Sequence, residues 1–390
     1  MKKRFLFILL IVSMNNISAQ HTAVKNINNL SFKLLQRIRK TEGNKNILLS
    51  AYSINNALAL TYLGAKNETK TEMQQIIFPY SEKNVPEEVK KLNDNLSFNR
   101  NLKLYSANNI WINEQEQIKK RFAKDVQEYF GASIQKADFS NKENIEKTRQ
   151  KINFWVEQKT ENKIKDFIEK GVLDESTVIV LVNAIYFYAK WKFQFDEHNT
   201  FADNFYDIYK NTTQTDFMHS VLSIDYYNNQ ELAAISIPYE HNEASLIIVL
   251  PDDFISFVYK MDNNYFEKIL SGFQKRKVNL SIPKFKQQSN YDLIEYFRNM
   301  GLVHLFSNAD LSGISGTKDT KVSNIIHQAV IDINESGTEA SAATAVIGSR
   351  SVSANNEQVI FNANRPFFYF VRENNTGTLL FSGLFLTPPM

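Results

Sequence analysis

The chain has 390 residues, of which 43% are hydrophobic and 22% are charged, a composition that can bury a sizeable core and that excludes a disordered protein. Its formal net charge is only +3, which argues against the basic surface of a nucleic-acid-binding protein. The absence of cysteine excludes disulfides and a cysteine nucleophile.

Residues 1–19 have the pattern of a secretory signal peptide. A basic start at residues 2–4 precedes the apolar run 5–12, and small and polar residues follow up to Ala19. A run this short does not cross a bilayer, which takes about 20 residues, although a buried N-terminal helix is an alternative. Removing this leader takes away three positive charges and no negative ones, so the net charge falls from +3 to zero. We expect residues 20–390 to be secreted, either to the medium or, in a Gram-negative bacterium, to the periplasm or cell surface.

Apolar residues at helical spacing mark the N-terminal half of the chain. Leu30, Leu34 and Ile38, for example, fall on one face of a helix. The predicted helices cover residues 30–40, 54–63, 121–130 and 152–168.

Strand-like runs dominate the rest of the chain. Residues 178–187 are nearly all apolar, as in a strand buried on both faces. The other predicted strands are residues 245–250, 278–282, 367–372 and 379–386. Because helices come first and strands later, we expect an α+β fold with large mixed sheets. No Pro/Gly/Ser-rich linker or repeat divides the chain, so a single domain is expected.

A long segment, 334–360, lies between two predicted strands and is far longer than a hairpin loop. If the first half of this segment is an extended strand, alternate residues point to opposite faces. One face carries only small or β-branched uncharged residues, and the one charged residue, Glu339, lies on the other face. Such a strand can enter the middle of a sheet, with Gly337 as a hinge. A solvated surface loop is the alternative. The inward residues are Thr338, Ala340, Ala342, Thr344 and Val346.

Seven sequence motifs occur together, in order, over nearly the full mature length. They are 152–156 with Thr160, Lys163 and Ile164; 181–187 with Lys190, Trp191 and Phe195; 282–285; 300–302 with Phe306; 310–314; 335–343; and 361–367 with 381–383. On these residues the chain resembles the serpins. It departs from the family's pattern at Ala51, where a proline is usual after Ser50, and at Ser336, where a charged residue is usual.

The resemblance implies the serpin fold, with one domain over residues 20–390 and an exposed reactive-centre loop at about 335–360. It implies a metastable inhibitor whose loop is cut by a protease, traps that protease as an acyl-enzyme and inserts into the central sheet. The implied hinge is Glu335, Gly337, Thr338, Glu339, Ala340, Ala342 and Ala343. A polar cluster under the sheet would consist of Ser53, Asn183 and His327. A buried, hydrogen-bonded histidine is also the ordinary structural interpretation of His327.

The reactive bond has two candidate positions. Family spacing counted from Gly337 indicates Ser351-Val352, whereas the chemistry favours Arg350-Ser351, because arginine suits the acidic pocket of a trypsin-like protease. Arg350 is the only basic residue between Thr338 and Asn364. We therefore prefer Arg350-Ser351, with Ser351-Val352 as the second choice and elastase-like cleavage near Val346 left open. An ordinary solubilising charge is the alternative role for Arg350.

Other functions find less support. A non-inhibitory serpin that acts as a chaperone, carrier or storage protein usually has bulky or charged inward hinge residues, which this chain lacks. A hydrolase is not indicated, since Gly-x-Ser-x-Gly and His-Glu-x-x-His are missing and the six histidines lack metal-ligand spacing. The basic clusters 119–121 and 275–277 are short enough to be solvated faces. We expect no cofactor, no metal, no nucleic-acid partner and no membrane span. The protein is expected to be a monomer. Its expected partner is a serine protease, with papain-like cysteine proteases as a second class of target.

Overall fold

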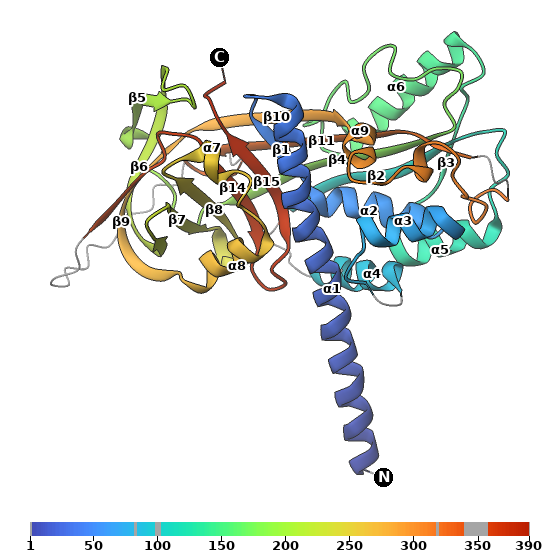
Figure 1. Ribbon diagram of the computed structural model, residues 1–390, viewed down its shortest axis with the longest axis horizontal. Helices are drawn as coiled ribbons and strands as arrows, with labels where there is room; N and C mark the ends of the chain where they lie inside the picture. Colours follow the sequence, from blue (N-terminus) through green and yellow to red (C-terminus); the bar gives the residue numbers. More distant parts are fainter. Residues whose placement is uncertain (1, 82–83, 98–102, 317–319, 339–357, 390) are drawn as a thin grey trace.

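The computed structural model describes residues 2–389 except for 82–83, 98–102, 317–319 and 339–357 (Figure 1). The helices in this part of the chain are α1 (Lys2–Glu42), α2 (Ala51–Tyr62), α3 (Asn67–Ile76), α4 (Val85–Ser97), α5 (Lys120–Phe130), α6 (Lys142–Lys159), α7 (Phe254–Phe257), α8 (Asn263–Ser271) and α9 (Ile294–Arg298). Helices and two large sheets together make an α+β fold, as predicted.

One sheet has six strands in the order β10-β11-β12-β4-β2-β3. They are β10 (Phe285–Asp292), β11 (Val322–Asn334), β12 (Gly337–Thr338), β4 (Ile179–Lys190), β2 (Lys103–Asn113) and β3 (Gln135–Ala137). The long strands β11 and β4 pair in parallel. The short β12 lies between them at one end and is antiparallel to both.

The other sheet has nine strands in the order β1-β15-β14-β8-β7-β6-β9-β13, with β5 paired to β6. They are β1 (Ile47–Leu49), β15 (Leu379–Phe385), β14 (Phe367–Glu373), β8 (Ala244–Pro251), β7 (Leu232–Pro238), β6 (Thr212–Asn228), β9 (Gln274–Pro283), β13 (Val359–Asn362) and β5 (Thr200–Tyr206). Most of this sheet lies at one end of the molecule, and most helices lie at the other (Figure 1).

Two apolar cores hold these layers together. The larger joins the nine-stranded sheet, helices α1–α5 and the inner face of the six-stranded sheet. The smaller lies between the outer face of the six-stranded sheet and α6. There the rings of Trp111 on β2 and Trp155 on α6 meet edge to face, 6.1 Å apart. Accordingly, α6 covers one face of the six-stranded sheet while α2 to α5 lie on the other (Figure 1).

Most predicted elements are present, but the predicted helix 152–168 is wrong at both ends. α6 begins ten residues earlier, at Lys142, because Asn141 caps it by accepting a hydrogen bond from the backbone N–H of Asn144 (3.0 Å). It ends at Lys159, since Glu161 and Asn162 have positive φ values of 51° and 60°, which no helix accommodates.

The long strand β6 has few consecutive apolar residues and had no clear sequence signal.

Helix α1 is continuous from Lys2 to Glu42, so the predicted helix 30–40 is the C-terminal part of a longer one. Its N-terminal part projects away from the body of the molecule (Figure 1). Among the described residues, no helix is both long and apolar enough to span a membrane. The signal peptide over residues 1–19 stays a prediction.

Candidate functional site

The segment 335–338 connects β11 to the long loop and is fixed in the six-stranded sheet. Thr338 pairs with Ile333 of β11 on one side and with Ala189 of β4 on the other. Gly337 pairs in the same way with Asn334 and Lys190. The first two residues of the loop therefore already occupy a place between β11 and β4.

Gly337 allows the close approach of β12 to β4. Its φ of 154° is one that side-chain-bearing residues rarely adopt. A Cβ atom at this position would lie 2.2 Å from the carbonyl oxygen of Ala189 and 2.7 Å from the Cα of Lys190. Both atoms belong to the backbone of β4, so neither can move aside cheaply. Any other residue at position 337 must displace either β12 or the facing part of β4.

Thr338 lies in an aromatic pocket and is fully buried. Its hydroxyl shares a 2.6 Å hydrogen bond with the hydroxyl of Tyr239. Tyr239 stacks on Trp191, with ring centroids 4.5 Å apart, and burial raises the pKa of the Tyr239 hydroxyl well above its usual value. The Trp191 indole donates to the carbonyl of Asn334 (2.8 Å). The pocket accepts a small side chain with one hydroxyl and has no room for a charge.

Glu335 anchors the start of the segment. The residue is 6% exposed, and its carboxylate forms an ion pair with Lys284 (2.9 Å), which follows β9. Burial raises the pKa of Glu335, but the hydrogen bonds that its carboxylate accepts, chiefly from Lys284, outweigh this effect and leave the pKa below its usual value. The Glu335 carbonyl also accepts from the backbone N–H of Phe195 (2.9 Å). The turn is thus held by both side chain and backbone.

The rest of the predicted loop, 339–357, lies outside the described residues. This applies to the hinge residues Glu339, Ala340, Ala342 and Ala343, and to both candidate reactive bonds, Arg350-Ser351 and Ser351-Val352. The two ends of the loop are placed. The loop starts after Thr338, inside the six-stranded sheet, and it ends before Val359, the first residue of β13 at the edge of the nine-stranded sheet.

The three residues of the predicted polar cluster meet under the middle of the six-stranded sheet. Asn183 on β4 and His327 on β11 are register partners whose side chains hydrogen-bond, and the Asn183 amide donates to the Ser53 hydroxyl of α2 (2.6 Å). Two further residues belong to the network. The amide oxygen of Asn108 on β2 accepts from both Asn183 and Ser53, and the backbone N–H of Ser50 donates to His327 Nε2 (3.1 Å).

His327 is a neutral structural residue in this network. Nε2 accepts from the Ser50 N–H, so the ring proton is on Nδ1, which donates to the amide oxygen of Asn183. The ring is fully buried, and this burial lowers the pKa of His327 to about 3. Because both ring nitrogens are engaged in hydrogen bonds to Ser50 and Asn183, the arrangement latches β11 to β4 and does not form a general base.

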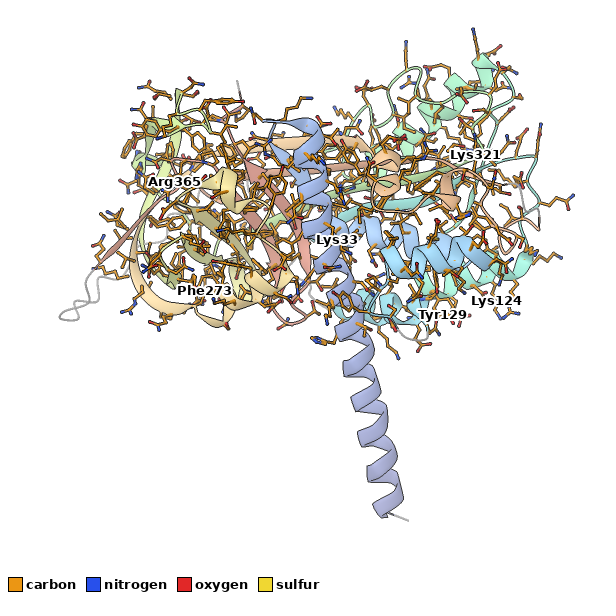
Figure 2. All side chains as sticks on the ribbon, in the orientation of Figure 1. Lys33, Lys124, Tyr129, Phe273, Lys321 and Arg365 are labelled. Atoms are coloured by element: carbon orange, nitrogen blue, oxygen red, sulfur yellow. The ribbon has the colours of Figure 1, made fainter. Side chains whose placement is uncertain are left out.

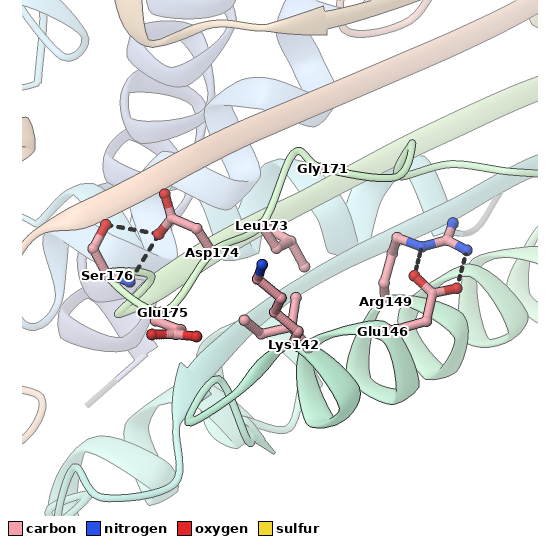
Figure 3. A pocket seen from close by; sticks show the side chains of 9 residues that line it. Lys142, Glu146, Arg149, Gly171, Leu173, Asp174, Glu175 and Ser176 are labelled. Carbon is pink, nitrogen blue, oxygen red and sulfur yellow. Dashed lines mark hydrogen bonds and ion pairs between the residues drawn. The ribbon is translucent and has the colours of Figure 1, made fainter.

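Helix α6 is tied to the connection that leads into β4. The side-chain oxygen of Asn153 accepts from the backbone N–H of Ile168 (2.8 Å), and Arg149 donates to the carbonyl of the same residue (2.7 Å). A cavity of about 560 Å³ lies between the first half of α6 and residues 171–176 (Figure 3). At its rim, hydrogen bonds from Arg149 lower the pKa of Glu146 to about 2. These contacts hold α6 against the connection that leads into β4.

The motif 361–367 joins β13 to β14. Arg365 (Figure 2) donates from Nε to the carbonyl of Pro251 (3.0 Å) and from Nη2 to the carboxylate of Asp252 (2.7 Å). These bonds fasten the chain leaving β13 to the end of β8. Arg365 therefore has a structural role: it fixes the C-terminal end of the loop to the nine-stranded sheet.

Sequence reasoning missed three partners of the site. Tyr239 lies outside the seven sequence motifs. Asn108 is one of several polar residues in β2, which also contains apolar ones. Ser50 contributes through its backbone, which no side-chain pattern reveals. For the part of the chain that the structure describes, no group of His, Asp and Glu side chains is arranged to hold a metal ion.

Comparison with known proteins points to one family. A family model described as "Serpin (serine protease inhibitor)" matches residues 25–388. Serpin B3 of Homo sapiens is 31% identical over 402 residues, which cover 96% of this chain and all of that protein. Among solved structures, Serpin48 of the insect Tenebrio molitor has a TM-score of 0.84 at 30% identity, covering 94% of this chain and 98% of its own. Human thyroxine-binding globulin complexed with thyroxine has a TM-score of 0.86 at 28% identity, covering 95% and 100%.

Proposed function

The chain belongs to the serpin family, and from this premise we propose that it is a secreted suicide-substrate inhibitor of a serine protease with trypsin-like specificity. The family is described as one of serine protease inhibitors, so the protein is expected to trap an enzyme and not to be one. The observation that carries the proposal is the position of β12 between β11 and β4.

Insertion of the loop would continue what β12 begins. At present β11 and β4 pair in parallel from Val322 to Val330. A strand entering between them in the direction of β12 replaces this one parallel ladder with two antiparallel ladders. Antiparallel pairs are slightly more stable per residue, and the number of backbone hydrogen bonds grows. This gain supplies the driving force that a single-use trap requires.

The registers of β12 indicate where the inserted residues would lie. Thr338 faces Ile333 and Ala189, and each residue further along the loop lies one residue further back on both neighbours. Continued in this way, Thr344 arrives between His327 and Asn183. Its hydroxyl would replace the hydrogen bond that now latches these two residues. The inward residues on the way are alanines, which pass without a steric barrier.

The chemical step uses the catalytic groups of the protease. Its serine hydroxyl attacks the carbonyl carbon of Arg350 and forms an ester, and the bond to the nitrogen of Ser351 breaks. The nitrogen leaves as a free amine with a proton from the protease's histidine. The cut loop then inserts, carries the esterified protease along and distorts its active site before water hydrolyses the ester. A papain-like cysteine protease would form a thioester at the same carbonyl.

Incubation of the mature protein with trypsin at near-equimolar ratio tests this proposal. We expect a band close to the sum of the two masses that survives denaturation, together with a released C-terminal peptide that begins at Ser351. A peptide beginning at Val352 would move the reactive bond to the second candidate. Complete cleavage without any covalent band, and with trypsin fully active, would contradict inhibition of trypsin.

Secretion is the second part of the proposal. The family match begins at residue 25, and the charged and apolar pattern of residues 1–19 lies before it. Expression of the full chain in a secreting host should yield a protein in the periplasm or medium whose mass corresponds to a start at Gln20. A protein that keeps Met1 and stays in the cell would contradict this part alone.

A carrier function is the alternative, favoured by the likeness to thyroxine-binding globulin at 28% identity. The inhibitory proposal is preferred because the inward hinge positions are small and uncharged. A carrier needs no covalent complex, so the trypsin experiment separates the two functions.

A further inference from the structure

The cavity between α6 and residues 171–176 has the size and the lining of a small-molecule site. Its volume is about 560 Å³, and ligand pockets typically have about 300–1,000 Å³. Apolar atoms make up most of its lining, to which the buried residues Ile145 of α6 and Leu173 of the connection contribute. The cavity can therefore take an apolar molecule of modest size.

Three of the charged side chains at this cavity already have partners within the protein (Figure 3). Arg149 donates to the Glu146 carboxylate from Nε (2.8 Å) and from Nη2 (2.7 Å), so these opposite charges neutralise each other. The Asp174 carboxylate accepts from the backbone N–H and the hydroxyl of Ser176 (2.8 Å and 2.7 Å). These hydrogen bonds, with a smaller contribution from the charge of Lys321, lower the pKa of Asp174. None of the three charges needs a ligand.

The two other charged side chains are unpaired and come from opposite walls. Within the part of the chain that the structure describes, neither Lys142 of α6 nor Glu175 of the connection has a hydrogen bond or an ion pair. They do not pair with each other either, so their charged groups are more than 4.0 Å apart. Lys142 is the first residue of α6, and the positive end of the helix dipole adds to its charge. Its ammonium points from α6 toward Leu173 (Figure 3).

We propose that this cavity binds an apolar zwitterion, a short apolar molecule with a carboxylate at one end and an ammonium at the other. The carboxylate faces Lys142, the ammonium faces Glu175, and the apolar part covers Ile145 and Leu173. A ligand of this class gives each unpaired charge a partner and removes apolar surface from water. The site shares no residue with the loop or the hinge, so the inference stands apart from the proposed inhibitory function.

Probes that share an eight-carbon chain and differ at their ends separate the roles of the two charges. They are 8-aminooctanoate, octanoate, octylammonium and 1-octanol. Saturation-transfer NMR titrations measure the dissociation constant of each probe for the wild type, for Lys142→Gln and for Glu175→Gln. Both replaced residues are exposed, so both variants should fold as the wild type does. Lys147→Gln is the matched control, because Lys147 is also on α6 but pairs with Glu143 (2.6 Å) outside the cavity lining.

We expect 8-aminooctanoate to bind the wild type most tightly, and each cavity variant to weaken its binding about threefold, as is typical of exposed ion pairs. Octanoate should respond only to Lys142→Gln and octylammonium only to Glu175→Gln, while Lys147→Gln leaves every dissociation constant unchanged. The absence of saturable binding for all probes would overturn the site. Binding that neither cavity variant weakens would place the probes elsewhere and would also overturn it. Octanoate that binds as tightly as 8-aminooctanoate would overturn the zwitterion as the class of ligand.

Discussion

Thr338 has room for a small side chain only. It is fully buried between β11 and β4, with its hydroxyl on Tyr239. We predict that Thr338→Arg or Ala342→Pro slows insertion, because the first buries an unpaired charge and the second removes a backbone donor from the new ladder. The inhibitor should become a substrate, with at least about tenfold more molecules cleaved per protease trapped. Titration of trypsin activity measures this ratio.

Glu339→Arg is the matched control for this prediction. It introduces the same side chain one residue later, on the side expected to face outward, and should keep the wild-type stoichiometry. A Thr338→Arg variant that still forms covalent complex at wild-type yield would show that inward size does not limit insertion.

His327 should make stability depend on pH. The folded pKa is about 3, whereas the unfolded value is about 6.5. Between these values the unfolded chain binds a proton that the folded chain does not, so the contribution is complete above pH 6.5 and is lost as pH falls. The expected slope is up to about 1.4 kcal/mol per pH unit.

Denaturant unfolding between pH 7.5 and 5 measures this slope, in a range where most carboxylates stay ionised. Two other histidines also have shifted pKa values: the hydrogen bond with Glu72 raises the pKa of His304, and burial lowers the pKa of His219. A His327→Gln variant retains both of them and isolates the effect. It should be less stable at pH 7.5 but lose less stability on acidification. Parallel curves for the two proteins would show that His327 is not kept neutral by folding.

At the level of elements, β12 depends on Gly337. We predict that Gly337→Ala releases β12 from the sheet, because its Cβ would lie 2.2 Å from the Ala189 carbonyl oxygen. In hydrogen exchange, the backbone amide of Thr338 should then lose protection, while amides in the middle of β4 keep theirs. Ser336→Ala is the matched control. It adds no atom against β4 and should keep the wild-type exchange pattern. Retained protection in the Gly337 variant would mean that β4 yields instead.

The sequence predicted elements better than their contacts. The buried strand at 178–187 and the closing pair at 367–386 have apolar patterns that determine them, and both are present. Strand β6 was not predicted because its many polar residues leave no run of apolar ones. The predicted helix 152–168 was too long because residues with positive φ follow Lys159 and end α6, although apolar residues continue at helical spacing beyond it. Side chains such as Tyr239 reach the site from 99 residues away, a distance over which spacing carries no information. The docking of Thr338 between β11 and β4 likewise depends on tertiary packing.

At the scale of the whole molecule, the loop joins two sheets that constrain it differently. Its start is inside the six-stranded sheet, and its end is an edge strand of the nine-stranded sheet. While the loop is intact, these two anchors limit how far it can enter between β11 and β4. Cleavage frees the first part from the second. The native chain is therefore expected to be held in a state of higher free energy by an intact covalent connection.

Thermal unfolding before and after cleavage of the loop tests this account most directly. Inserting about ten residues adds on the order of ten backbone hydrogen bonds at about 1 kcal/mol each. A domain of this size gains about 1.3 °C per kcal/mol, because its unfolding entropy is about 2.1 cal/mol/K per residue. We predict that the cleaved protein melts at least about 10 °C above the intact one. A cleaved protein that melts at the same temperature, or lower, would contradict insertion between β11 and β4 and with it the inhibitory mechanism.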